Sequence, residues 1–267
     1  MSFLNRARAL IAASHGNPAS AVIAAVAEKY LNAYNNLVNW DMHYNGELRA
    51  LRFLVNEVDG DVFDVGANAG QWATAMLPYL SDKSLHCFEP VPAVFSKLNT
   101  SLSAAPNAKI NNIGLGREPA ELEMNYSPSV NTITSRYDLV FDRDDQHKIT
   151  CHISTGDAYI LERHIQAISI LKIDVEGMEM DVLAGFDRAF CEGKVASVQF
   201  EHGEAHILSG HMLKDFVDFF ESHGFAVYVV FPRALKPLHY TFSSEGFEGR
   251  NFFAIRKDVA SRIGLAI

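Results

Sequence analysis

Charged side chains end two apolar runs in the second half of the chain. Lys172 and Asp174 close the run ISILKID, and Glu201 and His202 close the run VASVQFEH. Side chains alternate along a strand, so Lys172 and Asp174 share one face. A buried lysine beside a buried carboxylate needs a partner or a ligand. Open α/β sheets bind ligands at the carboxyl ends of their strands, so the pattern predicts a ligand site there.

Two chemical roles are open for these side chains. His202 could be a general base, because the ordinary pKa of imidazole lies near neutrality. Asp174, Glu201 and His202 could instead hold a divalent cation that lowers the pKa of a substrate hydroxyl. A metal is possible here but not expected. Glu176 and Glu179 either belong to the site or stabilise the start of the next helix, where acids are favoured.

The stretch 61–70, DVFDVGANAG, indicates how a ligand would be held. A short apolar run with Asp64 at its end stops in an elbow containing Gly66, Asn68 and Gly70, and helical spacing resumes at Gln71. Glycine permits backbone angles closed to other residues and removes the Cβ that keeps a ligand away. The amides of the following helix start can bind polar or anionic groups.

The spacing of the elbow favours a nucleoside over a dinucleotide. Asn68 and Gln71 occupy the second and third glycine positions of the dinucleotide fingerprint, so a pyrophosphate fits poorly. Glu89 ends the next apolar run, LHCFEP, where an acid accepts hydrogen bonds from ribose hydroxyls. A nicotinamide-dependent oxidoreductase is therefore the second enzyme class. A non-catalytic binding protein of the same fold would have a blocked ligand mouth or no polar rim.

Five motifs together resemble the FkbM-type family of S-adenosylmethionine (SAM)-dependent methyltransferases. They are FDVGANAGQW, HCFEPVP, the TGD at 155–157, LKIDVEGMEMDVLAGF and VQFEHG, and the resemblance covers about residues 45–255. It implies an α/β fold of the Rossmann-like class I methyltransferase type. Such a fold has a seven-stranded, mostly parallel sheet with helices on both faces. The resemblance also implies O-methylation of a hydroxyl of a sugar, a glycan or a polyketide-type metabolite.

The resemblance assigns roles by motif position. The methionine part of SAM would lie against Asp64, Gly66, Asn68 and Gly70. Its ribose would contact Glu89, and its adenine would lie near Asn112. The reactive sulfonium would lie near Asp174. His202, Glu201 and Asp174 are the candidate catalytic residues.

The elements that must position these residues follow from apolar periodicity. From residue 61 onward, strands alternate with helices, and residues 58–267 are expected to form the SAM-binding domain. Residues 119–154 break this rhythm, which predicts an inserted hairpin with a polar loop over 126–147 near the active site. Residues 1–57 are expected to be an N-terminal helical extension. It either packs against the sheet or forms a lid over the cofactor.

Composition limits the partners. The net charge of -9 argues against a nucleic-acid partner, because phosphate binding needs a basic surface. Cys87, Cys151 and Cys191 are far apart in sequence, which fits a reducing compartment and hence the cytoplasm. No apolar run is long enough for a membrane span. The expected partner is a small-molecule or glycan acceptor, and the sequence indicates neither its identity nor an oligomeric state.

Overall fold

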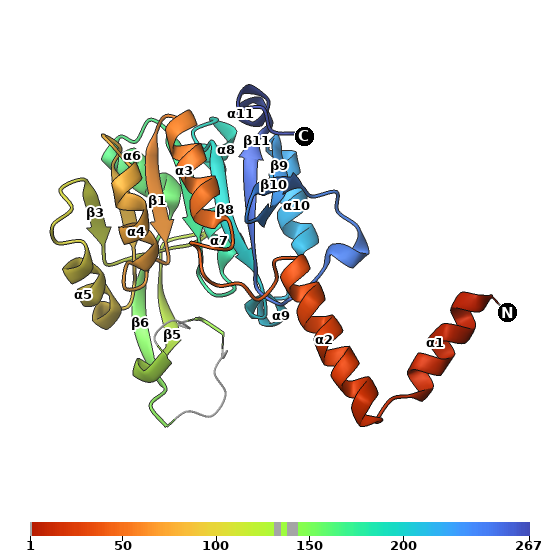
Figure 1. Cartoon of the computed structure of the whole chain (residues 1–267). Helices are drawn as coiled ribbons and strands as arrows, with labels where there is room; N and C mark the ends of the chain where they lie inside the picture. The colour runs from red at the N-terminus through yellow and green to blue at the C-terminus, as the bar shows by residue number, and fades with distance from the viewer. Residues whose placement is uncertain (1, 131–134, 138–143) are drawn as a thin grey trace.

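The computed structural model describes residues 2–130, 135–137 and 144–267. Within them, the central sheet has eight strands in the order β10-β9-β11-β8-β7-β1-β2-β3 (Figure 1). The strands are β1 (Asp61–Val65), β2 (Leu85–Phe88), β3 (Ala108–Asn111), β7 (Ile168–Ile173), β8 (Ser197–His202), β9 (Phe225–Phe231), β10 (Ala234–Pro237) and β11 (Arg250–Arg256).

The sheet is mainly parallel, which confirms the predicted fold class. β3, β2, β1, β7 and β8 are parallel neighbours, whereas β11 is antiparallel to both β8 and β9. The prediction of seven strands missed β10, which pairs antiparallel with β9 at the edge. β10 is short and contains Pro237, a residue that an edge strand tolerates and a central strand does not.

Helices cover both faces of the sheet. Side chains alternate along β1, so Phe63 and Val65 enter one core and Val62 enters the other. The core containing Phe63 packs against α6, α7, α8 and α10, and the other packs against α3, α4, α5 and α11. The helices of the domain are α3 (Glu47–Glu57), α4 (Gln71–Met76), α5 (Pro92–Ser101), α6 (Gly156–Arg163), α7 (Glu179–Ala184), α8 (Asp187–Cys191), α9 (Ala205–Ser209), α10 (Leu213–Ser222) and α11 (Lys257–Arg262), with 3-10 turns η1 (Leu77–Tyr79), η2 (Pro128–Val130) and η3 (Phe242–Ser244).

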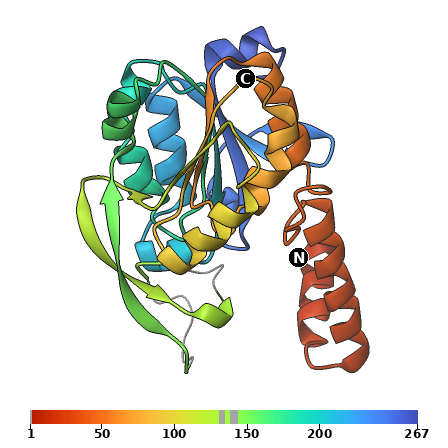
Figure 2. The same ribbon diagram turned by 90° about the vertical axis from the view of Figure 1, so that its left-hand side faces the viewer.

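A small second sheet forms the predicted insertion. β5 (Ala120–Tyr126) and β6 (His147–Ser154) are antiparallel, and β4 (Gly114–Leu115) pairs with β6. The hairpin extends beyond the body of the domain (Figure 2). The predicted loop over 126–147 lies partly outside the described residues.

The N-terminal segment divides into two parts. α3 packs on the sheet and buries Ala50, Leu51, Leu54 and Val55, as one of the two interpretations expected. α1 (Phe3–Ala13) and α2 (Pro18–Tyr34) have no buried residue and project from the domain in both ribbon views (Figures 1 and 2). Neither of these two helices therefore packs against the sheet. Among the described residues, no single helix is long and apolar enough to cross a membrane.

Candidate active site

The elbow after β1 is held by a buried ion pair. Asp64 and Lys172 are neighbours across β1 and β7, with 2.9 Å between Lys172 Nζ and Asp64 Oδ1. Lys172 Nζ also lies 3.4 Å from Asp174 Oδ2 and donates to the carbonyl of Gly66. Burial opposes the charge of Lys172, but the two carboxylates together raise its pKa. Lys172 therefore joins the tips of β1 and β7 as a cation.

The close approach of these tips explains Gly66. Its φ is 79°, and a Cβ built there would lie 1.8 Å from the carbonyl oxygen of Asp174. Asn68 also has a positive φ, of 47°, a conformation that asparagine tolerates better than most residues. The predicted Gly-rich elbow thus has a physical basis in the packing of two chain segments.

The loop between β7 and α7 is organised by Glu179. Its buried carboxylate accepts hydrogen bonds from the amides of Val175 and Gly177, at 2.8 and 2.9 Å. His206 Nε2 lies 2.9 Å from Glu179 Oε2. Glu176 and Gly177 have φ values of 54° and 98°, so the chain cannot be helical there. The sequence predicts a helix over 175–186, but the helix begins at Glu179. Glu179 is therefore a positioning residue.

A cavity of about 580 Å³ opens beside this loop, at the carboxyl ends of β7 and β8. Six of its twelve lining residues carry a carboxylate, and we call it the acidic cavity. Its lining residues are Trp40, Asp174, Glu176, Gly177, Glu179, Glu201, Gly203, Glu204, Ala205, His206, Glu248 and Gly249.

Crowding changes the acidity of two cavity residues. Burial, followed by repulsion from Asp174 and other acids, raises the pKa of Glu176 to about 9. The same two causes, in the same order, raise the pKa of Glu201 to about 8. Both groups can hold a proton near neutral pH and release it when a cation enters the cavity. Asp174 is more exposed, with 41% of its side chain accessible.

Glu89 and Asn112 brace the second strand tip. Glu89 Oε2 accepts from the amide of Asn68, and Oε1 accepts from the amide of Val91. Burial raises the pKa of Glu89 to about 7, against the lowering effect of these amides. Asn112 Nδ2 donates to the carbonyls of Glu89 and Pro90. Both side chains thus contact the elbow or its neighbouring loop, and their assigned contacts with ribose and adenine stay predictions.

Asp64 contacts Lys172 and does not line the acidic cavity. Its carboxylate is fully buried against Lys172, so any effect on a cofactor passes through Lys172 and the elbow. The sequence indicates that a buried Lys172 needs a charged partner. The register across β1 and β7 shows that this partner is the carboxylate of Asp64.

The structure corrects the role considered for His202. The residue is 1% exposed. Its Nδ1 lies 3.0 Å from the carbonyl oxygen of Gly246, and its Nε2 lies 3.4 Å from that of His211. His202 is not among the cavity residues, because side chains alternate along β8 and Glu201 takes the cavity face. The residue positioned as a candidate base is Glu201.

The same contacts argue against His202 as a metal ligand beside Asp174 and Glu201. Both nitrogens of His202 face carbonyl oxygens, so neither offers a lone pair to the cavity. Within residues 2–130, 135–137 and 144–267, one group of three potential ligand atoms lies within 4.8 Å, and it does not line the cavity. That group is Asp187, Cys191 and His223.

Sequence reasoning missed several residues that shape the site. Trp40 comes from the segment between α2 and α3 and lines the cavity. Its ring packs so closely against Gly249 that a Cβ at that position would clash with it. Ser135 donates from the insertion to the carbonyl of Glu176, at 2.6 Å. Glu47 is buried and accepts from Gln199 Nε2, which ties α3 to β8. Of these residues, only Glu47 is marked in the sequence, as the acid of the run Asn45-Gly46-Glu47.

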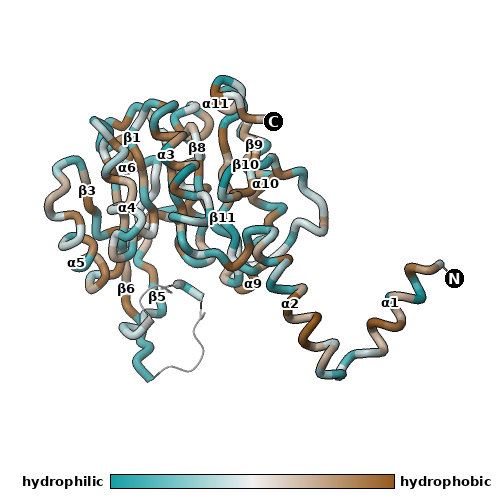
Figure 3. Tube along the Cα trace, viewed as in Figure 1, coloured by the Kyte–Doolittle hydropathy of each residue, from teal (hydrophilic) through white to brown (hydrophobic). Residues whose placement is uncertain are grey.

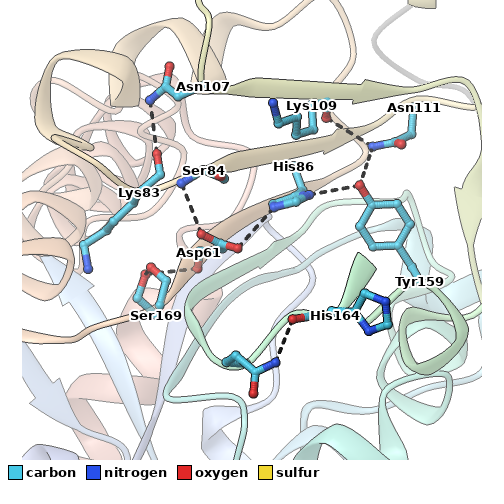
Figure 4. Close-up of polar contacts among 12 residues, drawn as sticks. Asp61, Lys83, Ser84, His86, Asn107, Lys109, Asn111, Tyr159, His164 and Ser169 are labelled. Atoms are coloured by element: carbon cyan, nitrogen blue, oxygen red, sulfur yellow. Dashed lines mark hydrogen bonds and ion pairs between the residues drawn. The ribbon is translucent and has the colours of Figure 1, made fainter. Parts of the chain in front are cut away.

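A second opening lies at the amino ends of the strands. Its volume is about 850 Å³, and Asp61, His86, Asn111 and Tyr159 are among its lining residues. His86 bridges Asp61 Oδ2 at 3.3 Å and the Tyr159 hydroxyl at 2.9 Å, and Asn111 donates to the same hydroxyl (Figure 4). These groups satisfy one another and belong to the opposite sheet edge from the acidic cavity.

The residues at the carboxyl edge fit a cationic nucleoside such as SAM. The carboxylates of the acidic cavity can balance a sulfonium and an ammonium. Of the residues assigned to the cofactor, Asp174 lines this cavity, whereas Gly66, Asn68, Gly70 and Glu89 do not.

Comparison with known proteins agrees with this arrangement. Residues 64–227 match the family model of the methyltransferase FkbM domain. "Methyltransferase 1" of Beauveria bassiana is 26% identical over 147 residues, covering 48% of this chain and 59% of that protein. "Hexuronic acid methyltransferase AglP" of Haloferax volcanii is 27% identical over 164 residues, covering 60% and 63% respectively. The chain thus spans less than two thirds of either relative.

Solved structures are more distant. The precorrin-6y C5,15-methyltransferase of Geobacter metallireducens GS-15 has a TM-score of 0.41 and 13% identity, over 79% of this chain and 88% of that one. A likeness of this degree carries no conclusion about chemistry. The match over residues 64–227 covers more than half of the chain and contains the elbow, the loop after β7 and Glu201. The chain therefore belongs to the methyltransferase FkbM domain family.

Proposed function

We propose that the protein is a SAM-dependent methyltransferase that O-methylates a hydroxyl group of a sugar, a glycan or a polyketide-type metabolite. Membership of the FkbM family supports methyl transfer. The relative named as a hexuronic acid methyltransferase supports a sugar acceptor. The observation that carries the proposal is the position of Glu201 and Asp174 on one cavity wall at the carboxyl ends of β8 and β7.

The residues at the two strand tips would hold the cofactor. The elbow of Gly66, Asn68 and Gly70 would receive the methionine part, and Glu89 has lone pairs left for ribose hydroxyls beyond its two amide contacts. Asp174 would balance the positive sulfur. Bound SAM supplies an activated methyl group on that sulfur.

Glu201 is the proposed general base. An alcohol is a weak nucleophile until its proton is removed, and a carboxylate with a pKa of about 8 is strong enough to accept it as the new C–O bond forms. The cationic charge of the bound cofactor favours the ionised form of Glu201 and so readies it for this step. Trp40, on the cavity wall, offers a flat apolar surface for a sugar ring.

The test separates binding from transfer. Calorimetry measures the affinity for SAM and S-adenosylhomocysteine, and mass spectrometry follows a gain of one methyl group on candidate sugars. We expect Glu201→Gln to lower turnover by about 10²-fold or more while the SAM affinity changes little. Glu162→Gln, on an exposed helix position, is the matched control. Equal loss of affinity and turnover in Glu201→Gln would place Glu201 in cofactor binding, and no SAM binding by folded protein would refute the proposal.

The compartment is proposed on chemical grounds. Cys87, Cys151 and Cys191 are all free thiols, and two of them are buried. Unpaired cysteines support a reducing compartment such as the cytoplasm.

A further inference from the structure

The arm formed by α1 and α2 exposes an unusual amount of apolar surface. Neither helix buries a residue. The arm projects from the domain, and hydrophobic and polar residues alternate along it (Figure 3). Isolated exposed apolar residues are ordinary, but a contiguous set marks a binding surface. In the arm, the large apolar residues that are more than half exposed are Phe3, Leu4, Leu10, Ile11, Val22, Ile23, Val26, Tyr30, Leu31 and Tyr34.

These side chains gather on one side of each helix. In α1, Phe3, Leu10 and Ile11 recur at spacings of seven and eight residues and share a face. In α2, Val22, Val26 and Tyr30 recur every fourth residue. Each helix is thus amphipathic, although the structure gives its apolar face no protein partner among the described residues.

Charge indicates the chemistry of the partner. Arg6 and Arg8 lie in α1, and the chain has no Asp or Glu before Glu28. The whole chain nevertheless carries a net charge of -9. A cationic, apolar segment on an acidic protein is complementary to a surface that is both apolar and anionic. Pairing of two such arms would bring like charges together.

We propose that α1 and α2 lie in the interface of an anionic lipid bilayer and hold the domain at its surface. Amphipathic helices with arginines beside an apolar face bind bilayers in this way, with the apolar side buried at the headgroup boundary. The chain bends by 114° between the two helices, so they do not form one continuous straight helix. Tyr30 and Tyr34 are of the type enriched at such interfaces.

The acidic domain opposes this binding only at short range. Repulsion between an acidic domain and an anionic surface is screened over about 8 Å at physiological salt, so acidic groups farther from the bilayer weaken the binding little.

The test is flotation of the full chain with vesicles of phosphatidylcholine containing phosphatidylglycerol, and with vesicles of phosphatidylcholine alone. We expect binding to the first, with Leu10→Gln/Ile11→Gln lowering it about tenfold or more. The control Ala9→Gln/Ala12→Gln adds the same groups on the opposite, exposed side of α1 and should bind within about twofold of the parent. Arg6→Gln/Arg8→Gln should remove the preference for anionic vesicles.

Other outcomes would overturn the proposal. Equal binding by the two Gln pairs would show that the apolar face is not used. Failure to float, together with a dimer by light scattering that the Leu10→Gln/Ile11→Gln variant loses, would assign the arm to a second copy of the chain. Circular dichroism of each variant checks that the domain stays folded, so that loss of binding is not mistaken for unfolding.

Discussion

The carboxyl side chains around the acidic cavity differ in what they contact. Glu179 accepts hydrogen bonds from two backbone amides and lies beside His206, so its carboxyl group fixes the loop. Glu176 and Glu201 are instead crowded by other acids, and burial and this crowding raise the pKa of each. The residue type alone does not distinguish a loop-forming acid from a reactive one.

The raised pKa of Glu201 has a consequence for stability. Its folded-state pKa of about 8 lies above the ordinary value of 4.5. Between these values the folded state keeps a proton that the unfolded state has lost, so stability falls as pH rises through that window. We expect Glu201→Gln to have a higher Tm than the parent at about pH 9 without cofactor, and a smaller difference near pH 6. Thermal melts at both pH values test this, and a pH-independent difference would contradict it.

The ion pair of Lys172 and Asp64 should be costly to break on one side. Lys172→Met would leave the fully buried Asp64 without its cation, at a cost of about 3–5 kcal/mol in the free energy of unfolding. Lys172→Met/Asp64→Asn removes both charges and should recover much of the loss. Urea denaturation measures both variants. A single variant as stable as the parent would show that Asp64 is already neutral.

Some site residues could be identified from sequence and others could not. Lys172, Asp174 and Glu201 were identified because charges are rare at the ends of buried strands. His202 was misplaced because the two-residue alternation of a strand puts it on the face opposite Glu201. Trp40 comes from a distant segment that no local pattern links to the cavity.

At the scale of elements, the conformation of the elbow after β1 depends on the close approach of the carboxyl ends of β1 and β7. Gly66→Ala would place a Cβ against the Asp174 carbonyl, a backbone atom that cannot move aside. We expect a loss of about 3 kcal/mol or more in the free energy of unfolding. Gly210→Ala is the matched control, because Gly210 has a similar φ of 77° but open space around it. Its cost should be about 1–2 kcal/mol. Similar losses for both, by urea denaturation, would mean that φ alone matters.

The apolar runs predicted the main strands because parallel strands covered on both faces are nearly continuously apolar. The loop after β7 was predicted as part of the following helix, over 175–186. Its course is decided by the left-handed residues Glu176 and Gly177 and by the hydrogen bonds of Glu179. β10 was missed because an edge strand of four residues leaves too short a pattern.

At the scale of the whole molecule, the arm is rooted in the sheet by a few hydrogen bonds. Asn36 Nδ2 donates to the carbonyls of Asn45 and Val230, and Arg250 donates to the carbonyl of Asn35. Asn36→Ala should cost about 1–2 kcal/mol, because two buried carbonyls lose their donor. It should also speed hydrogen exchange across residues 35–46. Unchanged exchange there would show that this segment is held by other contacts.

The segment that roots the arm also carries Trp40, which forms part of the cavity wall. Binding of the arm to a bilayer would therefore fix the orientation of the cavity relative to the membrane. An acceptor confined to the same lipid plane would then meet the cavity by lateral diffusion, a search in two dimensions at a fixed height and with a preset orientation. The arm would thus select acceptors by their location at the membrane, whereas the cavity would select which of their hydroxyl groups is methylated.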